Sequence, residues 1–174
     1  MKAVFIDESK SKAYVLCVVF LPLDQIPAIR KGLNKLRLRG QSRIHFVSES
    51  DRRRKQLLSY FRKLPIEVCF FEIKGRSEAE SRSWCLQEFV KSLPENQYFE
   101  IWLETDSNHL ALDKAVLTSS LAAGKKSSQV VFTHTDSRSQ VLLWIPDALA
   151  WVRTRGGDWL KEFKGFKSKV IRSR

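Results

Sequence analysis

The stretch KAVFIDES, residues 2–9, begins apolar and ends on two adjacent carboxylates, Asp7 and Glu8. The apolar residues 3–6 predict a short buried strand. An acid at a strand end often turns the chain through a side-chain hydrogen bond to the backbone. A metal-binding carboxylate at the strand terminus is the other interpretation, and only the rest of the chain can decide between them.

The composition predicts one globular domain over residues 1–174, since the chain is 43% hydrophobic and contains five Trp. Its longest apolar run, residues 13–23, is far shorter than the ~18–20 residues that a membrane helix needs. The first residues also lack the pattern of a signal peptide. We therefore expect a cytoplasmic protein without a membrane partner.

The formal charge of +12 favours a polyanionic partner, and nucleic acid is the first candidate. The three cysteines and three histidines show no paired spacing, which argues against zinc. Cys17 and Cys69 lie in apolar strand-like runs, and Cys85 lies in a helical pattern, so all three are expected to be structural thiols.

The order of elements predicts an α/β protein with a mixed five-stranded sheet flanked by helices. A helical insertion at about 22–64 separates the second and third strands. A basic tail at about 158–174 is assigned no element. The predicted strands are 2–8, 13–21, 66–74, 98–105 and 128–135, and the predicted helices are 23–38, 50–64, 77–93, 108–123 and 139–155.

A carboxylate in the last predicted helix is expected to point inward. Asp147 is four residues from both Leu143 and Trp151, on the face that should meet the sheet. An ionised carboxylate there is costly unless it is paired or binds a cation. Alternatively, Pro146 opens a new helix and Asp147 lies in its first turn, where the helix dipole favours negative charge.

A third acidic position is the end of the strand at 98–105. The two-residue period places Glu104 and Asp106 on one face. Because neighbouring strand ends converge, we expect Asp7, Glu104 and Asp147 to gather, with Asp106 as an alternate for Glu104. Such a cluster needs a compensating cation, and its hard oxygen ligands suit Mg²⁺ or Mn²⁺.

This arrangement resembles the ribonuclease H-like fold of ribonuclease H, retroviral integrases and Holliday-junction resolvases. In that fold the acids come from the first strand, the fourth strand and the last helix, which correspond here to Asp7, Glu104 or Asp106, and Asp147. The motifs FIDES, RIHF and IPDALAWV also look like domain-of-unknown-function family 3800, a bacterial family, over essentially the whole chain. Ser9-Lys10, where such members often have Gly, and Pro146 depart from its pattern. The resemblance implies a nuclease-like site.

The expected chemistry is phosphodiester hydrolysis with two divalent ions about 4 Å apart. Asp7 would bridge the ions, and Glu104 and Asp147 would each hold one side. Glu8 points to the opposite face of its strand. His45, in RIHF, could orient a water, contact a phosphate or shuttle a proton, or could be a structural hydrogen-bonding residue.

Basic residues in two regions are candidates for nucleic-acid binding. Cations at the start of a helix oppose its dipole, which suggests another use for the run at 52–55, although a solvated helix face is equally compatible. The tail could track a backbone or dock its Phe residues into the core. The candidates are Arg43, Arg52, Arg53, Arg54, Lys55, Lys161, Lys164 and Lys167.

These patterns predict a metal-dependent nuclease. The alternative is a non-catalytic nucleic-acid-binding or assembly subunit of a defence or mobile-element system. A hydrolase of small phosphoesters is a third class, but the large positive charge argues against it. The sequence leaves open a partner protein or a homo-oligomer.

Overall fold

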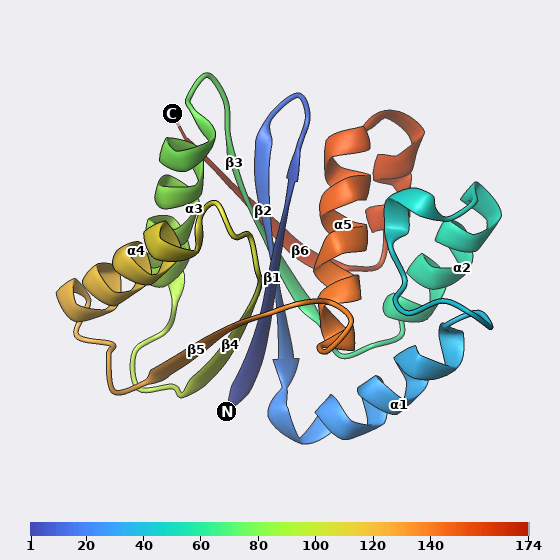
Figure 1. Cartoon of the computed structure of the whole chain (residues 1–174), viewed down its shortest axis with the longest axis horizontal. Coiled ribbons are helices and arrows are strands. Elements are labelled where there is room, and N and C mark those ends of the chain that lie inside the picture. Colours follow the sequence, from blue (N-terminus) through green and yellow to red (C-terminus); the bar gives the residue numbers. More distant parts are fainter. Residues whose placement is uncertain (174) are drawn as a thin grey trace.

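The computed structural model describes residues 1–173, which form one six-stranded sheet with helices on both faces (Figure 1). Helices α3 and α4 cover one face, and α5 covers the other with α1 and α2 beside it. The strands are β1 (Lys2–Lys10), β2 (Tyr14–Pro22), β3 (Glu67–Ile73), β4 (Phe99–Glu104), β5 (Val130–Thr135) and β6 (Lys167–Arg172). The α-helices are α1 (Ile26–Leu36), α2 (Asp51–Phe61), α3 (Glu78–Ser92), α4 (Leu110–Ala123) and α5 (Trp144–Arg155).

The sheet is mixed, as the sequence predicts, with the order β5-β4-β1-β2-β3-β6. β1 pairs antiparallel with β2 and parallel with β4, and β3 pairs antiparallel with β2. The outer strands β5 and β6 are parallel to β4 and β3. This order places β1 in the interior, where its end meets the end of β4.

The prediction of five strands is wrong, because part of the basic tail forms a sixth strand, β6. Its sequence, KSKVIR, contains only two apolar residues, so it has little strand character alone. The strand forms because β3 offers an unpaired edge. Val170 then packs on the α5 side and Ile171 on the α3 side.

Two helices are shorter than the sequence predicts because each begins with 3₁₀ geometry. The segment Leu23–Gln25 is a 3₁₀ turn before α1, and Val141–Leu143 is a 3₁₀ turn before α5. Pro146 lies in the first turn of α5, where its missing N–H removes no helical hydrogen bond. Asp147 therefore also lies in a first turn, as one of the two interpretations of this segment expects.

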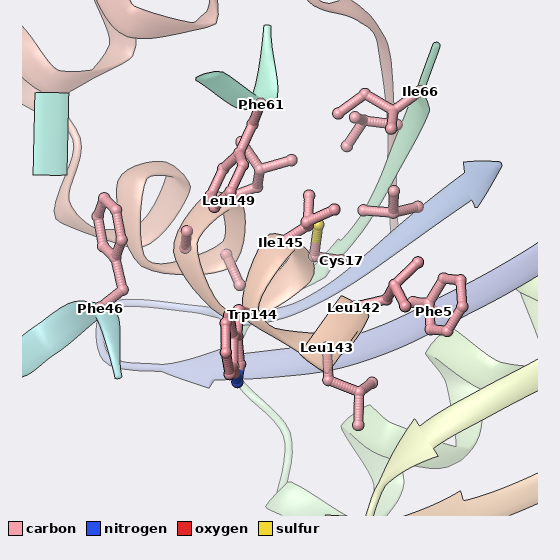
Figure 2. Packing of buried hydrophobic residues seen from close by; sticks show 14 of the residues in the cluster. Phe5, Cys17, Phe46, Phe61, Ile66, Leu142, Leu143, Trp144, Ile145 and Leu149 are labelled. Carbon is pink, nitrogen blue, oxygen red and sulfur yellow. The ribbon is translucent and has the colours of Figure 1, made fainter. Parts of the chain in front are cut away.

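The core has two layers, one on each face of the sheet. Figure 2 shows the α5 layer, in which Trp144, Ile145 and Leu149 of α5 form one buried cluster with Phe5 and Cys17 of the sheet. All five side chains are almost fully buried. This packing fixes the start of α5 over β1, and with it the position of Asp147. Within residues 1–173, no helix is both long and apolar enough to cross a bilayer.

Candidate active site

Asp7 and Glu104 lie side by side because their strands are parallel neighbours in register. Ile6 pairs with Leu103, so the next residue on each strand is one of the two acids. Ala3 and Phe5 of β1 pack on the α5 layer, and the two-residue period puts Asp7 on that same face. Asp7 and Glu104 therefore both point toward α5.

Asp147 approaches the same place from the first turn of α5. The backbone N–H of Phe46 donates to Asp147 Oδ2 at 3.0 Å. Phe46 begins the short 3₁₀ helix Phe46–Ser48, which lies in the segment between β2 and β3. The fold thus brings together residues from positions 7, 46, 104 and 147 of the chain.

The pKa values of the three carboxyl groups are all raised. Burial raises the pKa of Asp7 well above its usual value, and the charges of Asp147, Glu8 and Glu104 raise it further. Burial also raises the pKa of Asp147, although the Phe46 N–H opposes the shift. The pKa of Glu104 is likewise raised by burial and by Asp147. The site therefore accumulates negative charge at a cost in free energy.

The oxygen atoms at this site suit divalent cations. Glu104 Oε2 is buried and has no hydrogen-bond partner in the described part of the chain. Asp7 Oδ1 accepts the N–H of Glu8 at 2.8 Å. The ligand atoms of Asp7, Glu104 and Asp147 do not all lie within 4.8 Å of one another. That spread exceeds the shell of one Mg²⁺, whose oxygens lie about 2.0–2.1 Å from the metal.

Glu104 is held by a turn that follows β5. Asp136 Oδ1 accepts the N–H groups of Arg138 and Ser139, which closes the turn. The Ser137 N–H donates to Glu104 Oε1 at 3.3 Å. Arg43 Nη1 donates to Ser137 Oγ at 2.6 Å and lies 3.9 Å from Glu104 Oε1. Sequence reasoning missed Ser137, because a serine in a polar turn gives no distinctive signal.

His45 lies at the candidate site, next to Phe46. Its ring lowers the pKa of Asp147, although burial is the larger influence on that carboxyl. His45 Nδ1 is 3.3 Å from Ser48 Oγ. His45 and Asp147 also line the same cavity. The structure thus places His45 beside Asp147 and gives it a local hydrogen-bond partner in Ser48.

Asp106 does not join the carboxylate group, which corrects its expected position as an alternate for Glu104. β4 ends at Glu104, so the alternation of side chains stops there. Asp106 instead lies beside α3 and α4, where its ligand oxygen, one of Glu78 and a nitrogen of His109 fall within 4.8 Å of one another. A hydrogen bond from His109 is the main cause that lowers the pKa of Asp106 to about 2.

A positive charge already lies in this second cluster. Lys10 Nζ donates to Glu78 and, at 3.3 Å, to Asp106. Burial lowers the pKa of Lys10, but its acidic partners outweigh that influence and leave the pKa raised. The single ammonium group of Lys10 therefore offsets part of the negative charge of Glu78 and Asp106. In the group around Asp7, Arg43 lies 3.9 Å from Glu104 Oε1, and the pKa of Asp7 and of Glu104 nevertheless stays raised. We therefore prefer this group as the candidate for metal binding.

Glu8 lies on the opposite face from Asp7, as the alternation predicts. Glu8 Oε2 is 2.8 Å from Arg82 Nη1 on α3. Arg82 is almost fully buried and forms two hydrogen bonds with Asp113, at 2.6 and 2.8 Å. Tyr14 and His134 complete this network with contacts of 3.1 and 3.0 Å. The network fixes the end of β1 from behind the candidate site.

Some of the basic residues predicted to contact nucleic acid have structural partners instead. Arg54 donates to the carbonyls of Phe46 and Val47 and to Asp51. Its guanidinium also lies 4.4 Å from the centre of the Trp151 ring. Arg53 donates to the carbonyl of Leu36. Both residues hold the insertion in place, which explains cations that the helix dipole disfavours.

The remaining candidates differ in their surroundings. Lys161 pairs with Asp158 at 2.7 Å. Lys167 pairs with Glu67 at 3.0 Å and belongs to the α3 face, away from Asp7. Arg52, Lys55 and Lys164 are exposed, and no acidic group lies within 4 Å of them among residues 1–173.

A cavity of about 550 Å³ opens between the β1–β2 hairpin, residues 45–47 and α5. Asp147 and His45 lie on one side of it, and Lys12 and Arg155 lie at its basic end. Neither Lys12 nor Arg155 has an acidic partner within 4 Å in the described chain. Sequence reasoning missed both residues, because they become neighbours of the site only when the hairpin folds over α5.

Comparison with known proteins supports the fold. No protein-family model matches the sequence. No curated protein matches it either. Among solved structures, a chain in "Structure of the PCNA:RNase HII complex from Archaeoglobus fulgidus" is similar, with a TM-score of 0.57 and 18% identity. The alignment covers 94% of this chain and 77% of that chain.

The fold is ribonuclease H-like. At 18% identity the similarity extends to the fold alone. The ribonuclease H-like topology explains why acids far apart in the sequence meet at the end of β1. It leaves the activity to be argued from the side chains.

Proposed function

We propose that this protein is a metal-dependent nuclease whose ligands are Asp7, Glu104 and Asp147. The main support is the convergence of the three carboxylates on the α5 face, with pKa values raised by burial and, for Asp7 and Glu104, also by neighbouring carboxylates. The net charge of +12 and the ribonuclease H-like fold agree with this proposal. At a finer level, we propose membership of family 3800 and a single functional domain.

In this proposal Asp7, Glu104 and Asp147 would together hold the Mg²⁺ or Mn²⁺ ions. When bound, the ions supply charge stabilisation for the scissile phosphate and a water of lowered pKa. The N–H groups of Phe46 and Ser137 orient Asp147 and Glu104. His45 is positioned to accept or donate a proton beside Asp147. Lys12 and Arg155 would bind the phosphates of a nucleic acid that enters the cavity.

The decisive experiment compares two acid variants, Asp7→Asn and Asp106→Asn. Labelled single- and double-stranded DNA, RNA and an RNA–DNA hybrid are incubated with Mg²⁺ or Mn²⁺ and each protein. We expect cleavage to fall by at least about 100-fold in Asp7→Asn, because a group that holds the metal is lost. Asp106→Asn should retain cleavage, since Asp106 pairs with Lys10 and His109.

The same experiment identifies the alternatives. Loss of cleavage in Asp106→Asn but not in Asp7→Asn would move the metal centre to the cluster with Glu78 and His109. Binding without cleavage by the wild-type protein would favour a non-catalytic nucleic-acid-binding or assembly subunit. The substrate that is cut fastest would identify the preferred nucleic acid and its strandedness.

A further inference from the structure

A second cavity lies on the α3 face of the sheet, on the other side from the three carboxylates. It has a volume of about 300 Å³, at the lower end of the range for small-molecule pockets. Its lining comes from β1, β2, β3, β4, β6 and the end of α3. This cavity and the one beside Asp147 thus lie on opposite faces of the sheet.

The cavity lies at the end of α3, where Ser92 and Pro94 form part of its wall. That helix ends at Ser92 and packs on β2 and β3. Phe20, Cys69 and Phe99 line the apolar floor of the cavity. Phe99 and Cys69 are each about 1% exposed, whereas the Phe20 side chain is partly exposed. A flat or branched apolar group could pack against this floor.

The rim of the cavity carries a surplus of positive charge. Lys2, Lys167 and Lys169 all line it, and Glu67 is its one acidic residue within the described chain. The Glu67 carboxylate already forms ion pairs with Lys2, at 3.3 Å, and with Lys167, at 3.0 Å. Among residues 1–173, no carboxylate lies within 4 Å of Lys169 Nζ. Three lysines and one glutamate give the mouth of this apolar cavity a net charge of +2.

We propose that this cavity binds a small organic anion, which consists of an apolar body and one carboxylate, sulfonate or phosphate group. The apolar body packs on the partly exposed Phe20, above the buried Cys69 and Phe99, and the anionic group pairs with Lys169. Since Lys167 and Lys169 alternate with Ser168 on β6, both ammonium groups project from the same face of the sheet. The site is separate from the proposed metal centre, because Asp7 faces α5.

The probe for this site is 8-anilinonaphthalene-1-sulfonate, which has an aromatic body and a sulfonate and fluoresces in apolar surroundings. The full chain is titrated with it, together with Lys169→Glu, Phe20→Ala and the control Lys31→Glu. Lys31 is exposed on α1, away from the cavity, and its replacement changes the net charge by the same amount. We expect Lys169→Glu to raise the dissociation constant by about tenfold or more and Lys31→Glu to leave it almost unchanged.

Competition identifies the chemical class of the ligand. Hexanoate and hexyl phosphate should displace the probe, whereas 1-hexanol, with the same apolar chain and no charge, should not. The stronger of the two anions would tell whether a carboxylate or a phosphate is preferred. Phe20→Ala should weaken both anions, because it removes part of the apolar floor.

Three results would overturn the proposal. Equal weakening in Lys169→Glu and Lys31→Glu would mean that only the net charge matters. Displacement by 1-hexanol as strong as by hexanoate would mean that no anion is recognised. Displacement by a short oligonucleotide but not by hexyl phosphate would assign the lysines to nucleic-acid binding. Lys169 is exposed, so its variant should fold, which circular dichroism would check.

Discussion

Asp7 and Glu8 are consecutive in the chain, yet their carboxylates have opposite surroundings. Asp7 faces α5 and lies near two other acids, whereas Glu8 faces α3 and pairs with Arg82 at 2.8 Å. The period of two along a strand separates them. As a result one carboxylate is neutralised by the protein and the other is left with unbalanced charge.

The raised pKa of Asp7 leads to a prediction about stability. Protonated Asp7 favours the fold, and this contribution is fully present below its usual pKa of about 3.9 and lost as the pH rises through the raised folded-state value. At pH 7 without metal, Asp7→Asn should therefore melt at a higher temperature than the wild type. The increase should be about 2–4 °C for each kcal/mol that the substitution adds to the free energy of unfolding. Differential scanning calorimetry from pH 4 to pH 7 measures the effect, which should shrink toward pH 4.

Metal binding should reverse this order of stability. Mn²⁺ should raise the melting temperature of the wild type at pH 7, because binding to the native state alone stabilises it. Asp7→Asn should respond much less. Asp24→Asn is the control, since Asp24 is an exposed acid before α1. An equal response to Mn²⁺ in the wild type and Asp7→Asn would argue against Asp7 as a ligand.

At the scale of elements, a buried ionic network joins five of them behind the candidate site. Arg82 of α3 contacts Asp113 of α4, Glu8 of β1 and Tyr14 of β2, and His134 of β5 contacts Asp113. Arg82 and Asp113 are almost completely buried. Such a network tolerates little change, because each missing partner leaves a buried charge unpaired.

Replacement of Arg82 by Met should destabilise the protein by about 3–5 kcal/mol, the range measured when one partner of a buried pair is removed. Chemical denaturation measures this loss as a lower midpoint. Lys114→Met is the matched control on α4, since Lys114 is exposed. A loss below about 1 kcal/mol, the value of a surface ion pair, would show that the network contributes little.

The basic run at the start of α2 divides into two roles. Arg54 binds carbonyls of the segment that contains Phe46, whereas the side chain of Arg52 is exposed. Arg54→Met should therefore lower the melting temperature, because the carbonyls of Phe46 and Val47 lose their donor. Arg52→Met should leave stability unchanged and weaken nucleic-acid binding. Thermal melts and filter-binding assays on both variants test this division, and identical behaviour of the two would contradict it.

At the scale of the whole molecule, unpaired cations gather at the hairpin end of the sheet. Lys12 and Arg155 line the cavity beside Asp147, and Lys74 and Arg76 lie across the hairpin from it. None of these four has an acidic partner within 4 Å among the described residues. Their position beside the candidate site makes this end of the molecule the expected nucleic-acid interface.

Binding at this interface should depend on salt in proportion to the number of phosphate contacts. The double variant Lys12→Glu/Arg155→Glu should weaken binding. It should also make the slope of log affinity against log salt concentration less steep, by about 0.9 for each lost phosphate contact with duplex DNA. Lys31→Glu on α1 should change neither quantity. Fluorescence anisotropy at several salt concentrations measures both, and an unchanged slope in the double variant would exclude this surface.

The local elements were predictable because their signals lie within short stretches. Alternating apolar residues predict β1, β3 and β4, and the apolar faces of the helices predict most of α2 and α3. β6 could not be predicted, because its strand depends on pairing with β3 rather than on its own residues. The position of Asp106 was wrong for a similar reason, since the end of β4 stops the alternation on which the prediction rested.

The sequence by itself determined the α/β class, the order of most elements and the acids that converge, because hydrophobic period and strand ends are local properties. The tertiary structure decided which charges remain unbalanced. Lys10 pairs with Asp106, Arg82 neutralises Glu8, and Arg54 supports the insertion rather than projecting into solvent. These pairings join residues that are 8 to 96 positions apart in the sequence. The interaction of two charges depends on their distance in space. The order of the residues does not give that distance.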